Sequence, residues 1–555
     1  MGALGVLALA AVLFFARLGD RALWTMELRW AEIPREMRLS HDYFWPTING
    51  RTYYDKPLGS YWLVIAASRL TGSLDETAAR LPSAVSGLLG VALLMLLARQ
   101  LYDGRTAVLA GLVLATSFSF VYFARHASTD LENVTGELLA LVLFLRCEKR
   151  PGGRWVVGLW LVMALTSLTK GLLGFALPLL VLGTYSCLSD GRAELMRGMW
   201  RGPFASRLRW LSGRCRWLFT RWSVVGLLLA VTVYLFPFAV SWARTGSTQG
   251  LYMVYRENVQ RFFNAHNHRG PVYLYAYVIF GLMAPWSLLL PAALVRAHAA
   301  RSEDGSRRGD RFARVYFWAT FAFFTLSSSR RSYYLMPLLP AGALLVGRLL
   351  AAPPELSLTA RRLFRLGFGL TAVAVLLAGV ALLPVARFLP EPWSQLPSAP
   401  AWPIFAVCWL ASVVGFVAAL RRFDRSRVTI AVGGSAVLFL AYLFLIALPA
   451  TEGYRGERAL AEDTRRRLGS DSPGLAFYRT REPVFYLDLP QPVPEYDDRA
   501  SLVEAVRDGR VSWVLTRRRD LEAADLSAVV VEGEPTFAWE TAEQRGNKLV
   551  LARLK

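Results

Sequence analysis

The sequence predicts a polytopic α-helical membrane protein with a small α/β domain at its C-terminal end. Three observations lead to this fold class. Of the 555 residues, 54% are hydrophobic and only 19% are charged, whereas soluble proteins are about 25% charged. Apolar stretches close to the roughly 20 residues that cross a bilayer recur along the chain. Arginines and lysines gather between these stretches and give the chain a net charge of +22.

The apolar stretches predict about thirteen membrane spans. In chain order they are residues 3–18, 81–98, 106–124, 131–145, 155–168, 171–188, 224–242, 272–294, 315–326, 333–350, 368–385, 402–420 and 428–448. Segment 3–18 has the length of a signal peptide but lacks a small-residue cleavage site, so we interpret it as an uncleaved first span. The shorter apolar segment 58–70 and the amphipathic segment 27–39 are interpreted as interfacial or re-entrant helices.

The positive-inside rule orients these spans. Basic runs follow alternate spans, at residues 99–105, 149–154, 192–221, 296–314, 361–365 and 421–427. Counting 58–70 as a span would move these runs outside, which is why it is not counted. With a cytoplasmic N-terminus and an odd number of spans, the C-terminal end is expected outside.

The chain divides at Pro449. Residues 1–450 form the expected transmembrane catalytic domain, with a first external loop at 19–80. In residues 451–555, helix-like runs at 458–468 and 501–509 alternate with strand-like runs at 475–479, 511–516, 528–533 and 548–554. This pattern is typical of a small α/β domain, which the span count places on the periplasmic side.

Several classes of function fit the sequence poorly. The basic charge lies in short loops and no nucleic-acid recognition motif accompanies it. The four cysteines form no C-x-x-C pair, so disulfides and a zinc site are not expected. A transporter would also have many spans, but transporters commonly contain paired repeats, and no repeat is visible.

Acidic residues collect at one membrane boundary. Glu27 and the sequence Asp55-Lys56-Pro57 lie in the first external loop, and Asp130 lies at the outer end of the third span. Acids at a boundary are costly unless they are solvated or used. For the neighbouring Glu32, Arg35 and Glu36, an ordinary solvated amphipathic helix is the better interpretation. Glu27, Asp55 and Asp130 are the candidate catalytic residues.

Basic and aromatic side chains are expected on the same face of the membrane. They are Arg256, Arg261, Arg269, Arg330, Arg331, Tyr333 and Tyr334. Any one of these arginines could contact lipid headgroups, whereas the set together favours a phosphate site. His266 and His268 alternate in the same region, but two histidines are weak evidence for a metal site.

A series of motifs in fixed order carries a resemblance to a known family. The motifs are MELRWAEIPREM (26–37), NGRTYYDKPLGSYW (49–62), ARLPSAVSGLLGVALL (79–94), STD (128–130), LTKGLLGFALP (168–178) and RSYYLMPLLPA (331–341). In this order they resemble the ArnT-like bacterial glycosyltransferase family of lipid A aminoarabinose transferases, which is related to protein O-mannosyltransferases. The resemblance covers most of the first 350 or so residues.

The resemblance implies a GT-C fold and an inverting transfer of a sugar from an undecaprenyl-phosphate donor. The acceptor would be lipid A or another glycolipid or glycan on the periplasmic side of the bacterial inner membrane. Asp55 stands where the family has the Glu of its Glu-Lys-Pro motif, and Asp130 matches its later cavity Asp. The matching donor-phosphate residues are Lys56, Arg261, Tyr334, Tyr54 and Arg269. No cofactor is expected with certainty, and a divalent metal is left open.

The first motif departs from the family pattern. The family opens it with Asp-Glu, whereas this chain has Met26 before Glu27. A methionine neither accepts a proton nor holds a sugar hydroxyl. Three alternatives follow: Glu27 or Asp130 takes over, the acceptor chemistry differs from aminoarabinose transfer, or the protein is a pseudoenzyme that binds lipid-linked sugars.

Overall fold

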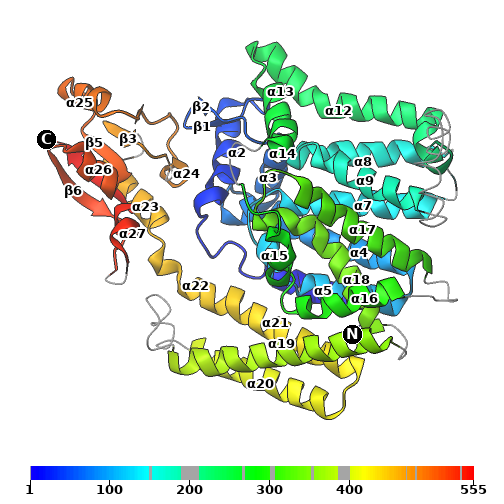
Figure 1. The fold of residues 1–555 in the computed structure, drawn as a ribbon. Coiled ribbons are helices and arrows are strands. Elements are labelled where there is room, and N and C mark those ends of the chain that lie inside the picture. Colours follow the sequence, from blue (N-terminus) through cyan, green and yellow to red (C-terminus); the bar gives the residue numbers. More distant parts are fainter. Residues whose placement is uncertain are drawn as a thin grey trace.

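The structure is a computed structural model. It describes residues 2–148, 150, 153–188, 212–264, 269–299, 307–351, 356–385, 401–469, 472–481, 484–537 and 540–554. Most of the basic run 192–221, as well as His266 and His268, lies outside the described residues. A large helical bundle holds the N-terminal part, and a smaller part with a β-sheet follows at one end of the bundle (Figure 1).

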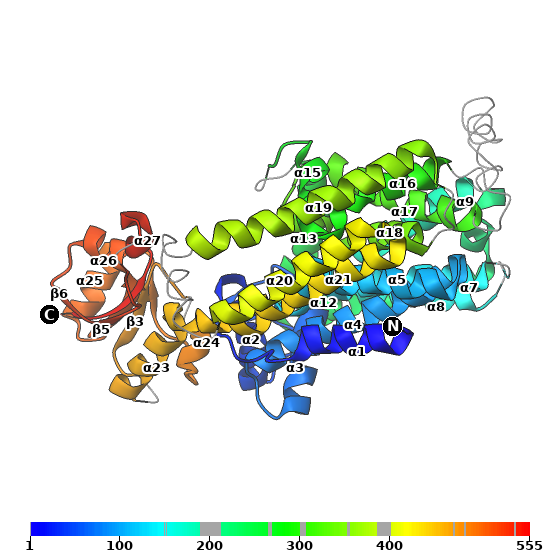
Figure 2. The same cartoon turned by 90° about the horizontal axis from the view of Figure 1, so that it is seen from below.

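Long apolar helices form the bundle because each buries its backbone hydrogen bonds within itself. The helices are α1 (Ala3–Phe15), α4 (Glu76–Leu101), α5 (Gly104–Ala115), α6 (Phe118–Ala124), α7 (Asp130–Cys147), α8 (Trp155–Lys170), α9 (Leu173–Cys187), α12 (Arg221–Thr245), α15 (Leu274–Leu282), α16 (Leu290–Ala299), α17 (Arg307–Leu326), α18 (Leu339–Ala351), α19 (Leu358–Val385), α20 (Ala401–Arg421) and α21 (Arg425–Tyr442). The C-terminal helices α19 to α21 lie side by side, and α22 (Leu448–Ala450) leads from α21 toward the sheet (Figure 2).

Each of the thirteen expected spans falls on a helix or on a pair of bent helices. By length and composition, six helices of the described chain can cross a membrane, or eight if each bent pair is one span. The bent pairs are α5 with α6, at 68°, and α15 with the segment Trp286–Ala299, at 119°. The chain is therefore a multi-pass membrane protein, and the number thirteen stays a prediction.

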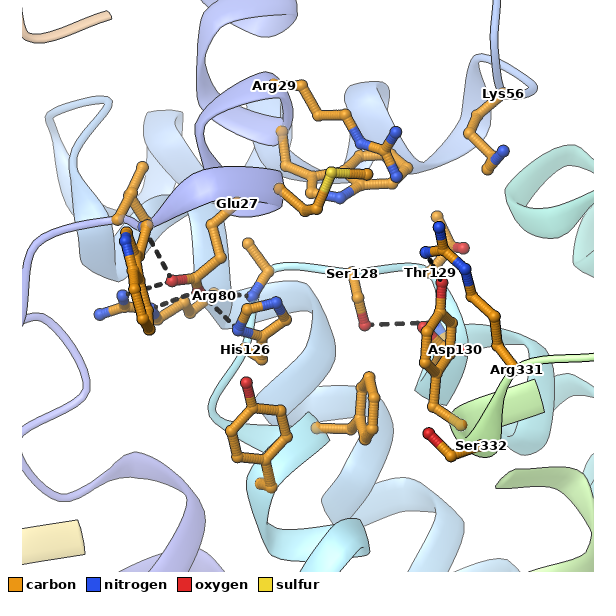
Figure 3. A pocket seen from close by; sticks show the side chains of 18 of the residues that line it. Glu27, Arg29, Lys56, Arg80, His126, Ser128, Thr129, Asp130, Arg331 and Ser332 are labelled. Carbon is orange, nitrogen blue, oxygen red and sulfur yellow. Dashed lines mark hydrogen bonds and ion pairs between the residues drawn. The ribbon is translucent and has the colours of Figure 1, made fainter. Parts of the chain in front are cut away.

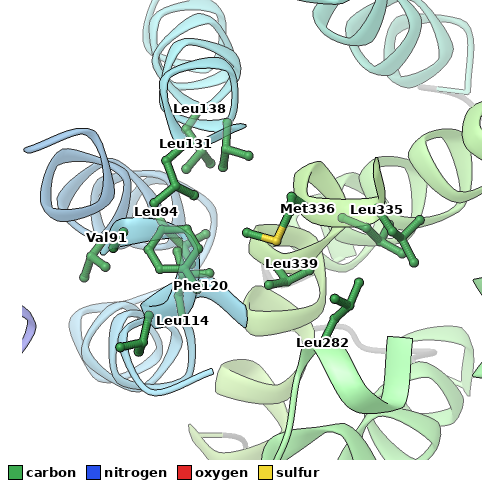
Figure 4. Packing of buried hydrophobic residues seen from close by; sticks show 14 of the residues in the cluster. Val91, Leu94, Leu114, Phe120, Leu131, Leu138, Leu282, Leu335, Met336 and Leu339 are labelled. Atoms are coloured by element: carbon green, nitrogen blue, oxygen red, sulfur yellow. The ribbon is translucent and has the colours of Figure 1, made fainter. Parts of the chain in front are cut away.

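Close packing between helices forms the core of the bundle. Phe120 of α6 packs among leucines of α4, α5 and α7, and Met336 and Leu339 approach from the other side (Figure 4). Small residues let backbones meet: a Cβ added to Gly347 of α18 would lie 2.6 Å from the backbone N and Cα of Ala110 on α5. Such small-residue contacts are the usual means of association for helices in lipid, where apolar burial gives little driving force.

The first external loop folds into two short helices joined by a hairpin. The helices α2 (Leu28–Ser40) and α3 (Gly59–Thr71) have 13 residues each, so each is about 20 Å long and too short to span a bilayer. Between them, β1 (Thr47–Ile48) pairs with β2 (Arg51–Thr52). Asn49 and Gly50 both have positive φ, as a tight hairpin turn requires.

The C-terminal part contains a five-stranded sheet with the order β4-β3-β5-β7-β6. The strands β3 (Leu475–Tyr478), β4 (Glu495–Tyr496) and β5 (Trp513–Arg517) are parallel, and β7 (Leu549–Leu554) pairs antiparallel with β5 and with β6 (Ala528–Gly533). The accompanying helices are α23 (Glu457–Leu468), α24 (Val484–Leu487), α25 (Arg499–Arg507), α26 (Arg518–Ala524) and α27 (Ala542–Gly546). The four strand-like runs of the sequence are thus strands.

Polar contacts attach this C-terminal part to the first external loop. The Asn49 side chain donates to the Val493 carbonyl at 2.7 Å and accepts from the Val493 N–H at 2.8 Å. Arg35 donates to the Leu489 carbonyl at 2.9 Å. Glu76, at the start of α4, accepts hydrogen bonds from Arg458 and from the Tyr486 hydroxyl, both at 3.1 Å. The loop and the C-terminal part therefore form one continuous wall.

We expect Gly347→Ala to destabilise the protein by about 1–3 kcal/mol, because its new methyl group would push α18 away from the α5 backbone. The matched control is Gly183→Ala on α9, where an added Cβ meets nothing within 4 Å; it should be neutral or stabilise by up to about 1 kcal/mol. Thermal unfolding in detergent measures both. Equal unfolding temperatures for the two variants would contradict this packing.

Candidate functional site

A cavity of about 1690 Å³ lies between the helical bundle, the first external loop and the C-terminal part. Fourteen arginines and lysines line it, against seven aspartates and glutamates. Apolar side chains of α9, α15 and α17 line another part of its wall, among them Ala176, Leu282 and Phe324. A cavity with a surplus of cations and an apolar wall suits an amphiphilic anion.

Glu27 forms a buried ion pair at one side of this cavity (Figure 3). Arg80 of α4 donates to both of its carboxylate oxygens at 2.9 Å. The Ala127 N–H donates to it at 2.9 Å, and His126 Nδ1 lies 3.3 Å away. Burial alone would raise the pKa of Glu27, but His126, Arg80 and these hydrogen bonds hold that pKa at about 2.

Arg80 also donates to three carbonyls of the chain segment that follows α1. The acceptors are Leu18, at 3.0 Å, Arg21, at 2.7 Å, and Ala22, at 3.1 Å. Both partners of the ion pair are only about 4% exposed. Glu27 is therefore a fully bonded carboxylate that holds three chain segments together, and its geometry is that of a positioning residue.

Asp55 and Lys56 stand at a second side of the cavity. Asp55 accepts from Arg29 at 2.9 Å and from Lys56 at 3.2 Å. Burial alone would raise the pKa of Asp55, but Lys56 and Arg29 hold that pKa below its usual value. Burial lowers the pKa of Lys56, and Asp55 opposes that shift. The carboxylate thus stays ionised between two cations, one of which, Lys56, reaches toward the cavity (Figure 3).

Arg261 stands close to the Lys56 side of the cavity. It begins α14 (Arg261–Phe263), directly after the π-helical turn Tyr255–Gln260. It is paired with Glu257, and it donates to the Tyr334 hydroxyl at 2.8 Å. Glu257 also lies 3.8 Å from Lys56, so one acid connects the two cations. Three of the predicted donor-phosphate residues, Lys56, Arg261 and Tyr334, are thereby brought together.

Asp130 lies in the first turn of α7, where the helix dipole favours a negative charge. It forms an ion pair with Lys170, the last residue of α8, and both side chains line the cavity. The next residue, Gly171, has a φ of +85°. Asn258 packs against it, accepting from the Leu172 N–H at 2.8 Å. This turn fixes Lys170 opposite Asp130.

Six of the eight predicted site residues line the one cavity: Glu27, Asp55, Lys56, Asp130, Arg261 and Tyr334. Tyr54 does not, because its ring packs between Trp45 and Phe238. Its neighbours Tyr53 and Asp55 line the cavity, whereas Tyr54 turns away from it. Arg269 is exposed and donates to Asn264 at 3.2 Å outside the cavity lining.

Sequence reasoning missed the partners that hold the predicted residues in place. They are Arg29, Arg80, His126, Lys170 and Glu257. Lys170 carried a signal, since a lysine that ends an apolar helix at a membrane boundary is costly without a partner. Glu257 carried one too, since it lies four residues before Arg261, a spacing at which side chains pair on a helix. Arg29 carried none, because its pairing with Asp55 depends on how distant segments meet.

Among the described residues, no three or more histidine, cysteine, aspartate or glutamate side chains are grouped so that they could hold a metal ion. His266 and His268 are not part of that search.

Comparisons with known proteins show what the chain is similar to. Residues 55–201 match the family of dolichyl-phosphate-mannose-protein mannosyltransferases. The undecaprenyl phosphate-alpha-4-amino-4-deoxy-L-arabinose arabinosyl transferase 1 of Pseudomonas fluorescens is 30% identical over 390 residues, 69% of this chain and 65% of that protein. The corresponding transferase of Erwinia tasmaniensis is 27% identical over 378 residues, 66% of this chain and 63% of that protein. Each alignment spans just under two thirds of the relative's length.

The fold has a solved counterpart. The crystal structure of ArnT from Cupriavidus metallidurans bound to undecaprenyl phosphate superposes with a TM-score of 0.73 at 24% identity, covering 99% of this chain and 97% of that one. Its apo structure gives a TM-score of 0.69. The fold and the cavity define the class, a membrane protein of the GT-C fold. This chain shares that fold with ArnT, and its ordered motifs are similar to those of the ArnT-like family.

We expect Glu27→Gln to destabilise the protein by about 3 kcal/mol at neutral pH, because it leaves Arg80 buried without its charge partner. The folded pKa of about 2 lies below the ordinary value of 4.5. The stability that this carboxylate contributes is therefore present above pH 4.5 and is lost as the pH falls toward 2. The difference between wild type and variant should shrink over that range.

Unfolding in detergent at several pH values measures this difference. Glu504→Gln serves as the control, since Glu504 is exposed on α25 and should differ little from wild type at any pH. A cost of Glu27→Gln that stays constant from pH 7 to pH 2 would show that the charge of the pair is not what stabilises the cavity wall.

Proposed function

We propose that this protein is an inverting glycosyltransferase that moves a sugar from a polyprenyl-phosphate donor, such as undecaprenyl phosphate, to a lipid or glycan on the outer side of the membrane. The observation that carries the proposal is one basic cavity that joins Lys56, Arg261 and Tyr334 to the carboxylates Asp55 and Asp130. The names of the relatives and the ligand of the ArnT structure support a lipid-phosphate donor.

The donor phosphate would lie between Lys56 and Arg261. Both cations lie next to Glu257. A phosphate that enters the cavity can therefore replace this carboxylate as their partner without a large rearrangement. The lipid chain would lie along the apolar wall of α9, α15 and α17. Lysine and arginine hold phosphate by charge-assisted hydrogen bonds. They also stabilise the additional negative charge that forms on the phosphate as the sugar departs.

In the transfer step, an acceptor oxygen attacks the anomeric carbon from the face opposite the phosphate. A new carbon–oxygen bond forms while the bond between that carbon and the phosphate oxygen breaks, and the electron pair leaves with the phosphate. An acceptor hydroxyl gives its proton to Asp130 or Asp55, from which it passes to water in the open cavity. Since a lipid phosphate is a good leaving group, the main task of the two carboxylates is to orient the acceptor.

Glu27 fits a different role from the one expected of it. Its oxygens accept from Arg80 and from the Ala127 N–H, so it has little capacity left to take a proton from an acceptor. We therefore assign acceptor orientation to Asp130 and Asp55, and we assign to Glu27 the positioning of the segment that carries Met26.

We expect Asp55→Asn, Asp130→Asn and Lys56→Ala each to lower glycosyl transfer by about a hundredfold or more, because each removes a charge next to the reacting groups. The assay follows release of undecaprenyl phosphate from a radiolabelled lipid-linked sugar by purified protein in nanodiscs. Asp497→Asn is the control, since its side chain is 74% exposed on the C-terminal part; it should retain activity.

Two further outcomes of this assay are informative. Full activity in all three variants would contradict the proposed catalytic site. Tight binding of undecaprenyl phosphate by wild type without any turnover would favour the pseudoenzyme alternative. Adding a chelator to the same reaction decides whether a divalent metal takes part.

The orientation that we propose places the cavity and the C-terminal part on the periplasmic side of the inner membrane. We therefore expect a peptide tag after the C-terminal residue to be cleaved by protease in spheroplasts while a cytoplasmic marker protein stays intact. A tag that is cleaved only after the membrane is lysed would place the C-terminal part in the cytoplasm and contradict the proposed orientation. With a cytoplasmic N-terminus, that result would also rule out an odd number of spans.

A further inference from the structure

The charge of the cavity restricts the sugar that the donor can carry, if the proposed function holds. With fourteen basic and seven acidic side chains in its lining, the cavity remains strongly cationic even after a donor phosphate has entered. The cations of the lining also repel one another. Burial and the like charges of Arg80 and Arg21 lower the pKa of Arg125 to about 10. A positively charged ligand would add to this repulsion.

The carboxylates of the lining are engaged with the protein's own cations and N–H groups. Glu27 is paired with Arg80, Asp55 with Arg29 and Lys56, Asp130 with Lys170, Glu257 with Arg261 and Arg256, and Glu540 with Lys548; Glu534 accepts from the Leu549 N–H, and Glu457 interacts with Arg455. An ammonium group would have to displace one of these partners inside a basic cavity. Taking a partner away from a largely buried charge is costly.

Aromatic faces are the other means of holding an ammonium group, and arginines cover several of those in the lining. Arg455 lies 4.6 Å from the ring centroid of Trp24, and Arg29 lies 5.2 Å from that of Trp30. Arg331 and Arg261 cover the rings of Tyr333 and Tyr334 at 5.7 and 5.8 Å. These rings therefore already interact with a cation.

Met26 opens the first of the motifs that carry the family resemblance. It lines the cavity, is 48% exposed and directly precedes the buried Glu27. The family motif has an aspartate at this position. An exposed carboxylate there would have been available to a ligand, since it would not be buried in an ion pair. The thioether that replaces it offers neither charge nor a strong acceptor.

We infer that the sugar transferred by this protein carries no ammonium group, in contrast to the 4-amino-4-deoxy-arabinose in the names of its relatives. A neutral sugar meets no repulsion in the cavity. An acidic sugar such as a hexuronic acid would be attracted by its surplus of cations. Neutral and acidic sugars share the absence of a positive charge. This inference rests on the proposed function.

The test compares undecaprenyl-phosphate-linked 4-amino-4-deoxy-arabinose with the same donor carrying an N-formyl group, which removes the positive charge and adds a small planar amide. Glucose and glucuronic acid donors complete the panel. Purified wild-type protein in nanodiscs should release undecaprenyl phosphate from the N-formyl donor at least about tenfold faster than from the amino donor, a factor that one charge-assisted hydrogen bond can give. The glucose and glucuronate arms then separate a neutral from an acidic substrate.

Substitution of Met26 by an acid tests the role of this residue. Met26→Asp should shift the ratio of amino to N-formyl turnover toward the amino donor by about tenfold. Met26→Asn is its matched control, because it has the same shape without the charge, and it should keep the wild-type ratio. Competition of each donor for bound undecaprenyl phosphate gives a second measurement that does not depend on turnover.

The outcomes separate this inference from the function on which it rests. A wild-type preference for the amino donor overturns the inference and leaves the proposed function standing. An equal shift in Met26→Asp and Met26→Asn also overturns the role given to Met26. Failure of wild type to bind any of the donors, or undecaprenyl phosphate itself, overturns the proposed function and the inference with it.

Discussion

The need to pair every charge that is withdrawn from water governs this structure. The clearest case is the ion pair of Glu27 with Arg80, in which both side chains are about 4% exposed. An isolated buried charge would cost several kcal/mol. The pair avoids that cost by using almost every hydrogen bond that the two groups can make, including three carbonyls after α1 and the Ala127 N–H. It thereby joins the segments that begin the cavity wall.

The same requirement explains why the cavity has its shape. Asp55 with Arg29 and Asp130 with Lys170 connect separate segments around the opening, and Glu257, which lies 3.8 Å from Lys56, connects a third. Helices in lipid pack through small residues and shape, which leaves polar contacts to set the arrangement of the loops above them. The C-terminal part adds a wall by binding the hairpin at Asn49. The cavity thus lies at the membrane boundary, where charged side chains are tolerated but still need partners of opposite charge.

The sequence was sufficient for the fold and for most of the candidate site, for different physical reasons. Helices in lipid must satisfy their own backbones, so the apolar runs predicted the bundle directly, and every expected span coincides with a helix or a bent pair. The site residues followed from the position of acids at a membrane boundary and from the ordered motifs. Tyr54 was wrongly expected beside the phosphate residues, because sequence does not say which of two adjacent tyrosines faces inward.

What the sequence could not supply is the pairing of charges between distant segments. Glu27 looked like a free acid in a loop, and only the three-dimensional contact with Arg80 shows that it is occupied. The same information changes the meaning of Met26. Read alone, a methionine in place of an acid suggests a damaged site. In a cavity whose acids are engaged with the protein's own groups and whose cations are in surplus, a methionine at this position offers an amino sugar no negative charge. The departure from the family is then a change of substrate charge, consistent with two intact carboxylates, Asp55 and Asp130, beside the phosphate residues.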